Sequence, residues 1–297
     1  MATVTIEFPA NIDLAATVRG AKQPLMIGPT EAHWATRTPD GVGSLSLKRL
    51  TETTIAAEAW GDGSDWLLRQ APKLLGSQDS IDGFKPPKQV RDQWLRAPFL
   101  MARTDRIWDA LVGGVLGQKV QTTKAHESRR RICRKFGDAA PGPNGGWVLP
   151  SPETLANLGY ADFHQLGVER KRAEILIRVA REMPRLENLT SRTPAQVSAR
   201  LQAIRGIGPW TAGMVTATAM GDPDAVPIGD FHIPNTISWL LAGEPRGDDK
   251  RMLELLEPYE GHRWRVIRLA KGTTNAPRYG PRLSLTDFRD LEARGRR

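Results

Sequence analysis

Residues 193–237 read TPAQVSARLQAIRGIGPWTAGMVTATAMGDPDAVPIGDFHIPNTI and contain two helical patterns joined by a tight turn. In the first pattern, Val197, Leu201 and Ile204 recur at a spacing that places them on one helical face. The second pattern covers residues 210–220 and ends at a glycine, which is a common helix stop. The segment therefore predicts a hairpin of two helices.

Gly206, Ile207 and Gly208 form the turn of this hairpin. Glycine tolerates unusual backbone angles, and without a side chain it lets another molecule approach the backbone. Because the second helix begins here, free N–H groups and the positive end of its dipole face outward, and such a surface binds phosphate. A plain helical corner that uses its glycines for packing is the alternative, because short glycine motifs are frequent by chance.

The longer pattern is more specific than the turn. Residues 201–212, LQAIRGIGPWTA, are followed by residues 221–230, GDPDAVPIGD, a Gly/Pro-rich loop that ends in aspartate. The order and separation of the two motifs resemble those of the helix-hairpin-helix (HhH-GPD) superfamily of DNA glycosylases, and in particular the 3-methyladenine DNA glycosylase II (AlkA) type. The resemblance is clearest between residues 98 and 245. It implies a predominantly α-helical fold in which two helical subdomains flank a cleft.

The N-terminal part of the chain has a different pattern. Apolar and polar residues alternate near residues 4–8, 45–47 and 55–59, which predicts half-buried strands, and a helix is predicted from Ser64 to Leu75. The order of strands and helices resembles the N-terminal domain of the AlkA type, which is similar to one half of a TATA-binding protein. We assign this α+β domain a structural role.

Composition shifts suggest the domain boundaries. Residues 1–88 form the α+β domain, and residues 89–98 a linker that follows a polar, proline-containing stretch. Residues 99–297 are predicted to form the all-α glycosylase region, with the hairpin at residues 201–215.

The charge balance favours a nucleic-acid partner. The chain has 42 Lys and Arg against 33 Asp and Glu, a net charge of +9, which attracts phosphates. A single cysteine, Cys133, excludes an intrachain disulfide and a four-cysteine iron–sulfur cluster. No apolar run approaches the length of a membrane span, and the first residues lack a signal-peptide layout. We expect a cytoplasmic monomer, associated with the nucleoid through DNA, that contacts no membrane and requires no cofactor.

Asp230 is the candidate catalytic residue, at the end of the Gly/Pro-rich loop and just before an apolar, periodic segment. A helix cap would also explain an aspartate here, and Asp222 and Asp224 are alternatives that turn chemistry explains as well. Breaking an N-glycosidic bond builds positive charge on the sugar. A carboxylate stabilises that charge and orients the attacking water. An N-alkylated purine is already cationic and leaves without a general acid, so a site with one carboxylate suits alkylated purines.

The resemblance also bears on the reaction type. Bifunctional relatives carry a lysine two residues after the last hairpin glycine, where it forms a Schiff base with the sugar; here that position is Trp210. Water is therefore the expected nucleophile, without lyase activity. Trp210, Phe231 and Met214 are the candidate base-pocket residues, and Trp210 suits either stacking on an electron-poor base or helix packing. Met214, and the residues near Lys271, stand where the family has aromatic side chains.

The resemblance assigns two further sets of residues. Gln118 and Lys119 match the loop that lies against the minor groove, where the family's wedge side chain is typically apolar. The backbone carbonyls of Gln202, Ile204 and Ile207 match those that hold a monovalent cation, Na⁺ or K⁺, at the hairpin. We expect the DNA-contacting residues to be Gly206, Ile207, Gly208, Gln118 and Lys119.

Together these features predict a monofunctional DNA glycosylase that binds damaged double-stranded DNA. It would flip out and hydrolytically excise alkylated purines, of the 3-methyladenine and 7-methylguanine type, in base excision repair. The alternatives are a non-catalytic helix-hairpin-helix protein that binds DNA damage, and a glycosylase for deaminated or oxidised purines.

Overall fold

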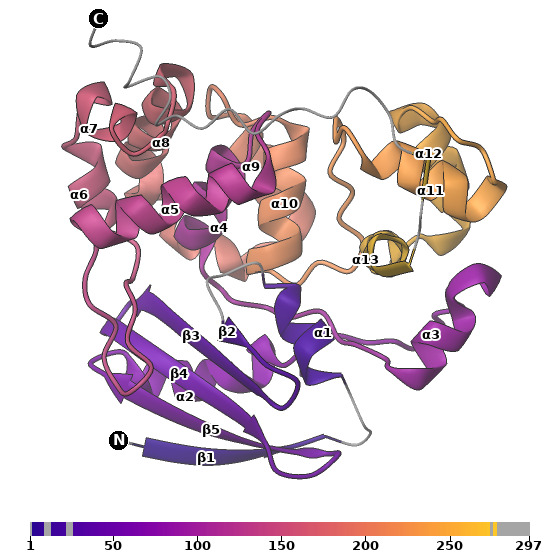
Figure 1. Ribbon diagram of the computed structural model, residues 1–297, viewed down its shortest axis with the longest axis horizontal. Helices are drawn as coiled ribbons and strands as arrows, with labels where there is room; N and C mark the ends of the chain where they lie inside the picture. Colours follow the sequence, from indigo (N-terminus) through magenta and orange to yellow (C-terminus); the bar gives the residue numbers. More distant parts are fainter. Residues whose placement is uncertain (1, 9–12, 22–25, 274–275, 278–297) are drawn as a thin grey trace, which may run out of the picture.

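The computed structural model describes residues 2–8, 13–21, 26–273 and 276–277 (Figure 1). Its N-terminal part is an antiparallel sheet in the order β1-β5-β4-β3-β2, with two helices. The elements are β1 (Ala2–Glu7), α1 (Leu14–Arg19), β2 (Met26–Ile27), β3 (Glu31–Thr38), β4 (Gly41–Arg49), β5 (Thr54–Gly61) and α2 (Ser64–Leu74).

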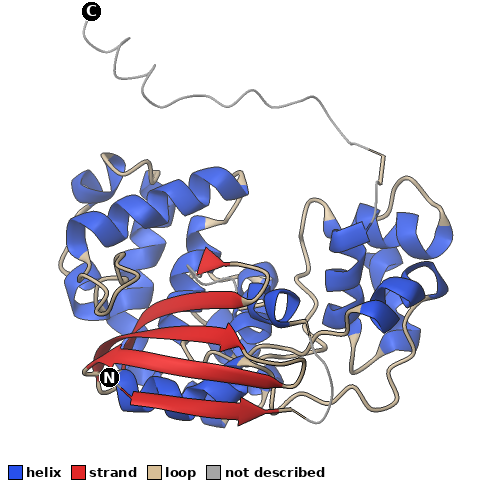
Figure 2. Cartoon of the chain, turned by 60° about the horizontal axis from the view of Figure 1, so that its bottom comes forward, coloured by secondary structure: helices blue, strands red, loops and turns tan. Residues whose placement is uncertain are grey.

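Alternating burial along the strands explains this sheet. In β3 every second residue is buried, from Ala32 and Trp34 through to Thr38, and β5 alternates in the same way. The buried faces pack with α1 and α2 in one apolar core, and Figure 2 shows the sheet with helices behind it. Strands β2 and β3 were not among the sequence predictions, because alanine and threonine make the alternation of β3 weakly apolar.

The first helical group runs from α4 to α10, left in Figure 1. One apolar core lies at its centre. The elements are α4 (Ile107–Leu116), α5 (Thr122–Phe136), α6 (Pro152–Ala156), α7 (Tyr160–His164), α8 (Arg170–Glu182), η2 (Met183–Arg185), η3 (Glu187–Ser191), α9 (Pro194–Gln202) and α10 (Pro209–Ala219).

The second helical group has its own core, to which α10 also contributes. Residues 211–219 of α10 are all buried, so this helix lies between the two groups and packs against both. A helix that is apolar all round is suited to such a position. The elements of this group are η1 (Lys88–Val90), α3 (Arg91–Arg96), α11 (Ile233–Ala242), α12 (Asp249–Leu256), η4 (Glu257–Tyr259) and α13 (Arg263–Thr273).

The predicted linker, residues 89–98, is more ordered than its composition suggests. It contains α3, and the buried side chain of Trp94 packs edge-to-face against Phe84 and Phe99 in the second helical core. The sequence prediction of a linker did not include this helix, because Val90 and Trp94 are the buried side chains in an otherwise polar stretch. The division between the α+β part and the helical region stays a prediction.

Polar contacts hold the sheet against the first helical group. The Thr36 hydroxyl on β3 donates to the buried Asp109 carboxylate on α4, and Arg129 pairs with the same carboxylate. In addition, the proline/glycine-rich loop after α5 crosses the sheet, where the Ser44 hydroxyl donates to the Pro141 carbonyl. The α+β part is thus tied to α4, the helix that leads into the turn containing Gln118.

A buried ion pair anchors the chain before α3 to α13. Nη2 of Arg265 lies 2.7 Å from Oδ1 of Asp79, and the two side chains are 0% and 2% exposed. Arg265 also donates to the carbonyl oxygens of Phe99 and Ser80. Removing one partner of such a pair leaves an uncompensated buried charge, which is more costly than losing an exposed pair.

We predict that Asp79→Asn lowers the free energy of unfolding by about 3 kcal/mol, because it leaves the Arg265 guanidinium buried without its counter-charge. The matched control is Asp40→Asn, whose pair with Arg69 is exposed and contributes less than about 1 kcal/mol. Urea unfolding followed by circular dichroism measures both. An equal loss of unfolding free energy in the two variants would contradict the prediction.

Candidate active site

The hairpin turn requires glycine at one of its two glycine positions. Gly206 has a φ of +101°, and a Cβ placed on it would lie 2.5 Å from Cγ1 of Ile175 on α8. The turn is closed by the Ile207 N–H, which donates to the Ile204 carbonyl at 2.9 Å, and the Ile207 side chain is buried. Gly206 is therefore explained by packing and backbone conformation alone.

Gly208 is different. It is the N-cap of α10, with an ordinary φ of −100°, and a Cβ placed on it meets nothing within 4 Å. Neither strain nor packing demands glycine here. A glycine that faces open space at the start of a helix, where the first N–H groups lack intrahelical partners, suits the close approach of an anion.

The turn after α4 is bonded to this hairpin. The Gln118 side-chain amide donates one hydrogen bond to the Gly206 carbonyl and one to the Thr211 hydroxyl, each of 3.0 Å. Both amide hydrogens are thereby engaged within the protein, so contact with DNA is left to its carbonyl oxygen. Next to it, Lys119 is exposed and has a φ of +54°, an uncommon value for a residue other than glycine.

Trp210, the second residue of α10, links this turn to the catalytic candidate. A Cβ on Gly117 would lie 3.3 Å from Cη2 of Trp210, so the indole packs against the end of α4. On its other side, the indole Nε1–H donates to Oδ2 of Asp230 at 2.8 Å. Sequence reasoning placed both residues at the site but did not foresee this bond.

Asp230 is held at the start of α11. Its Oδ1 accepts hydrogen bonds from the backbone N–H groups of His232 and Ile233, at 2.8 and 2.9 Å. Asp230 lies two residues before His232, the N-cap of α11, so it is not itself the cap. One of its oxygens still accepts the first N–H of the helix, from Ile233, and the other accepts the Trp210 N–H, so the helix-capping and catalytic interpretations are compatible. The preceding loop reaches this position because Gly213 lets it approach α10: a Cβ there would lie 3.1 Å from the Val226 carbonyl.

These contacts favour the ionised form of Asp230. Burial raises the pKa of this carboxyl, but the hydrogen bonds from Trp210, His232 and Ile233 lower it, as does the Lys271 ammonium, and the net effect is a pKa below the usual value. The carboxylate is therefore charged at neutral pH. Its contribution to stability is complete above the unfolded-state pKa and is lost as the pH falls through the lower folded-state pKa.

The two alternative aspartates have other roles. Asp224 binds the Arg263 guanidinium at the start of α13 and also accepts the Arg263 backbone N–H. Asp222 accepts the Asp224 N–H at 3.0 Å, and burial raises its pKa. Both line a second pocket, of about 510 Å³, bordered by α9 and α10. Their contacts shape the loop that leads to Asp230.

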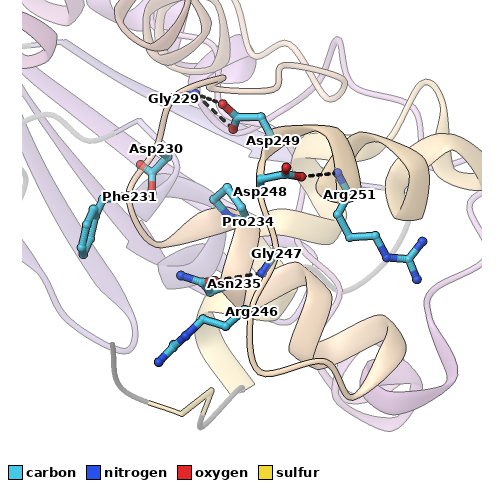
Figure 3. A pocket seen from close by; sticks show the side chains of 10 residues that line it. All are labelled: Gly229, Asp230, Phe231, Pro234, Asn235, Arg246, Gly247, Asp248, Asp249 and Arg251. Carbon is cyan, nitrogen blue, oxygen red and sulfur yellow. Dashed lines mark hydrogen bonds between the residues drawn. The ribbon is translucent and has the colours of Figure 1, made fainter. Parts of the chain in front are cut away.

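Asp230 itself lines a pocket of about 720 Å³ between the starts of α11 and α12 (Figure 3). The sequence did not reveal two residues that line this pocket, Asp249 and Asn235. The Asp249 carboxylate accepts the Gly229 N–H at 3.0 Å, and the Asn235 side chain accepts the Gly247 N–H. No motif marks these residues. The remaining lining residues are Phe231, Pro234, Arg246, Asp248 and Arg251.

The other base-pocket candidates lie at different depths. Phe231 is 62% exposed and extends away from the pocket wall in Figure 3. Met214 is only 8% exposed and packs in the second helical core, where half-buried Trp210 also packs. Trp210 and Phe231 are thus accessible to a ligand at the surface of the free protein, whereas Met214 lies beneath it.

A metal centre is not indicated by the described residues, in which no three His, Cys, Asp or Glu side chains gather to hold an ion. The carbonyls of Gln202, Ile204 and Ile207 remain the predicted cation ligands at the hairpin. Within the described part of the chain, none of the helices has both the length and the apolar character needed to cross a membrane.

Comparison with known proteins agrees with this geometry. The family described as HhH-GPD superfamily base excision DNA repair protein matches residues 112–260, about half of the chain and including the hairpin and Asp230. A DNA-3-methyladenine glycosylase of Bacillus subtilis (strain 168) is 30% identical over 175 residues, which are 54% of this chain and 57% of that protein. The chain therefore matches just over half the length of this curated relative.

Two solved structures resemble the whole fold. The 3-methyladenine DNA glycosylase of Archaeoglobus fulgidus has a TM-score of 0.73 at 18% identity, covering 90% of this chain and 97% of that one. The 8-oxoguanine glycosylase/lyase of Clostridium acetobutylicum has a TM-score of 0.66 at 12% identity, covering 91% and 96%. The fold is thus that of a helix-hairpin-helix glycosylase, including the N-terminal sheet.

The chain belongs to the HhH-GPD superfamily of base excision DNA repair proteins.

The hairpin glycines offer a matched pair of variants. Gly206→Ala should lower the free energy of unfolding by about 2 kcal/mol or more, because it adds a clash to a strained φ. Gly208→Ala should change it by less than about 0.5 kcal/mol, because its Cβ meets open space. Thermal or urea unfolding of the two proteins measures this. A large loss of unfolding free energy in Gly208→Ala would contradict the prediction and show that Gly208 is needed for packing.

Proposed function

We propose that this chain is a monofunctional DNA glycosylase that hydrolyses the N-glycosidic bond of alkylated purines in double-stranded DNA. The observation that carries the proposal is the Asp230 carboxylate, which three N–H donors hold in one orientation beside an open pocket. An ionised, oriented carboxylate is the group that stabilises a cationic sugar without reorganising during the reaction.

The chemistry follows from that charge. As the C1′–N bond breaks, positive charge grows on the sugar, and the Asp230 carboxylate stabilises it. The same carboxylate orients and deprotonates the attacking water, whose oxygen forms the new bond to C1′. A 7-methylguanine or 3-methyladenine base carries a positive charge in DNA, so it departs as a neutral molecule without a proton from the enzyme. The name of the Bacillus subtilis relative agrees with this substrate class.

The hairpin and the turn after α4 supply the contacts that hold the DNA. Gly208 leaves the N-terminus of α10 open to a phosphate, and the net charge of +9 attracts the phosphate backbone. Lys119, presented by the turn that Gln118 fixes, occupies the wedge position with an alkyl stem and an ammonium. Gly208→Ala is expected to leave the fold intact. A loss of DNA affinity in this variant would therefore assign Gly208 to DNA binding and not to protein stability.

A non-catalytic damage binder and a glycosylase for other lesions are the competing functions. The first is favoured by Lys119 and Met214, which depart from the family pattern. The second is favoured by a less aromatic pocket, because Met214 and the residues near Lys271 stand where the family has aromatic side chains that stack on electron-poor bases. The fold also resembles that of the Clostridium acetobutylicum 8-oxoguanine glycosylase/lyase. Both alternatives give distinct results in the same assay.

Incubation with duplex DNA containing 7-methylguanine or 3-methyladenine should release the free base, as measured by chromatography. We predict that Asp230→Asn lowers the single-turnover rate at least 100-fold, because the neutral amide no longer stabilises the cationic sugar. DNA affinity should remain within a few-fold of wild type. The matched control is Asp248→Asn, a pocket carboxylate that caps α12 and should retain the rate.

Three outcomes would contradict the proposal. Tight binding of damaged duplex without any base release indicates the damage binder. Release of hypoxanthine or an oxidised purine, with no release of methylated purines, indicates the other glycosylase class. A borohydride-trapped adduct would contradict the monofunctional assignment, which rests on Trp210 at the lyase lysine position.

A further inference from the structure

Helix α8 contacts both of the loops that the proposed function assigns to DNA. Near its start, the Arg172 guanidinium donates to the carbonyl oxygen of Leu116, the last residue of α4, at 3.0 Å. Further along, Arg178 donates to the Arg205 carbonyl at 2.8 Å, just before the hairpin glycine Gly206. The helical rise between the two arginines is about 9 Å along the axis. One rigid element thus bridges two loops that are far apart in the sequence.

The face of α8 between these arginines packs directly against the hairpin. Ile175 lies midway between Arg172 and Arg178, and residues at this spacing are neighbours on a helix surface. Its side chain is buried, and a Cβ on Gly206 would lie 2.5 Å from Ile175 Cγ1. The three residues therefore form one stripe of α8, and the hairpin backbone packs on its C-terminal half.

Arg172 stabilises the end of α4 from inside the protein. The residue is only 5% exposed, and the carbonyl that it binds is among those that the last turn of a helix leaves without an intrahelical partner. A cation at this end of a helix is also favoured by the helix dipole. Its carboxylate partner, Glu169, is exposed and lies 3.4 Å away. The buried contact of Arg172 is therefore with the end of α4, where the turn of Lys119 begins.

The turn that presents Lys119 depends on such support. Lys119 has a φ of +54°, and a residue other than glycine keeps such a conformation only where the surrounding structure fixes it. The Gln118 side chain, next to it, is bonded to the hairpin, and Arg172 holds the preceding Leu116. The conformation of the turn is thus fixed from the hairpin and from α8 together.

We propose that Arg172 and Arg178 are positioning residues for base flipping, through which α8 holds the turn of Lys119 and the hairpin at one fixed separation. Lys119 then enters the duplex at a set distance from the phosphate that the start of α10 binds. Extruding a nucleotide requires both actions at once, since the strand must be held while the wedge replaces the base. This inference rests on the base-flipping step of the proposed function and adds two residues that lie outside the Asp230 pocket.

The test compares two arginines of α8 whose substitution removes the same charge. Arg178→Gln removes the contact with the hairpin, whereas Arg181→Gln, the matched control, removes a 3.3 Å contact with the Ala156 carbonyl of α6. A duplex with 2-aminopurine beside 2′-fluoro-7-methyldeoxyguanosine, whose glycosidic bond is stable, reports on flipping through the fluorescence of the unstacked 2-aminopurine. Release of 7-methylguanine from the cleavable duplex is measured in single turnover at saturating enzyme.

We expect Arg178→Gln to lose most of the fluorescence rise and to slow base release about tenfold, because a small displacement of a positioned group has a large effect on rate. Its affinity for intact duplex should equal that of Arg181→Gln, since both variants lose one charge. Arg178→Lys should restore most of the fluorescence rise, because the contact uses a single N–H donor.

Two results for Arg178 overturn the inference. One is an equal effect of Arg178→Gln and Arg181→Gln on fluorescence and on base release. The other is a lower affinity of Arg178→Gln for intact duplex, together with a weaker dependence of that affinity on salt, because this combination identifies a direct phosphate contact.

Arg172 is tested through Lys119, because a buried arginine also affects stability. Arg172→Lys keeps the buried charge but shortens the donor, and Lys119→Gly removes the wedge side chain while glycine accepts the positive φ. We expect Arg172→Lys to slow base release severalfold in the wild-type background and to have no further effect in the Lys119→Gly background. Additive effects of the two substitutions overturn the assignment of Arg172.

The two readouts separate this inference from the function on which it rests. If the wild-type protein releases 7-methylguanine and Arg178→Gln flips and releases it equally well, the inference alone is overturned. If the wild-type protein flips the base without releasing it, the proposed function alone is overturned, and the fluorescence of Arg178→Gln still decides the inference. A wild-type protein that neither flips nor releases the base overturns both.

Discussion

The close packing around α10 is the constraint on which the site depends. This helix is buried along almost its whole length between two helical cores. Small residues let its neighbours approach: Gly117 admits the indole of Trp210, and Gly213 admits the loop that ends at Asp230. Because Trp210 is fixed by packing, its N–H holds one carboxylate oxygen in place, while the start of α11 holds the other. The orientation of the candidate catalytic group is therefore a result of helix packing.

The same packing links the DNA-facing surface to the carboxylate. Gln118 joins the turn after α4 to the hairpin and to α10 through two hydrogen bonds. The proposed wedge, the phosphate-facing turn and Trp210 thus form one connected unit, and the sheet supports it through the Thr36–Asp109 contact. A rigid arrangement of this kind favours a reaction in which the protein must place charge next to an extruded nucleotide.

Part of the fold and of the candidate site could be predicted from local sequence patterns. The hairpin follows from glycine spacing and helix periodicity. Asp230 became the candidate through the resemblance of its loop to the family motif, and its catalytic role stays a prediction. The bond from Gln118 to Gly206 was not predictable, because the partners are 88 residues apart and no motif specifies side-chain direction. Strand β3 was missed because Ala32 and Thr36 give a weak apolar signal, and α3 because only Trp94 marks its burial.

The central claim is that Asp230 stabilises positive charge at the sugar, and a binding measurement tests it directly. A duplex with a pyrrolidine abasic analogue carries a cation where the sugar becomes cationic, whereas a tetrahydrofuran analogue of the same shape is neutral. Transition-state analogues bind at least 100-fold more tightly than ground-state ligands. We predict a preference of about that size for pyrrolidine DNA in the wild-type protein and the loss of this preference in Asp230→Asn. Equal affinity of the wild-type protein for both duplexes would contradict it.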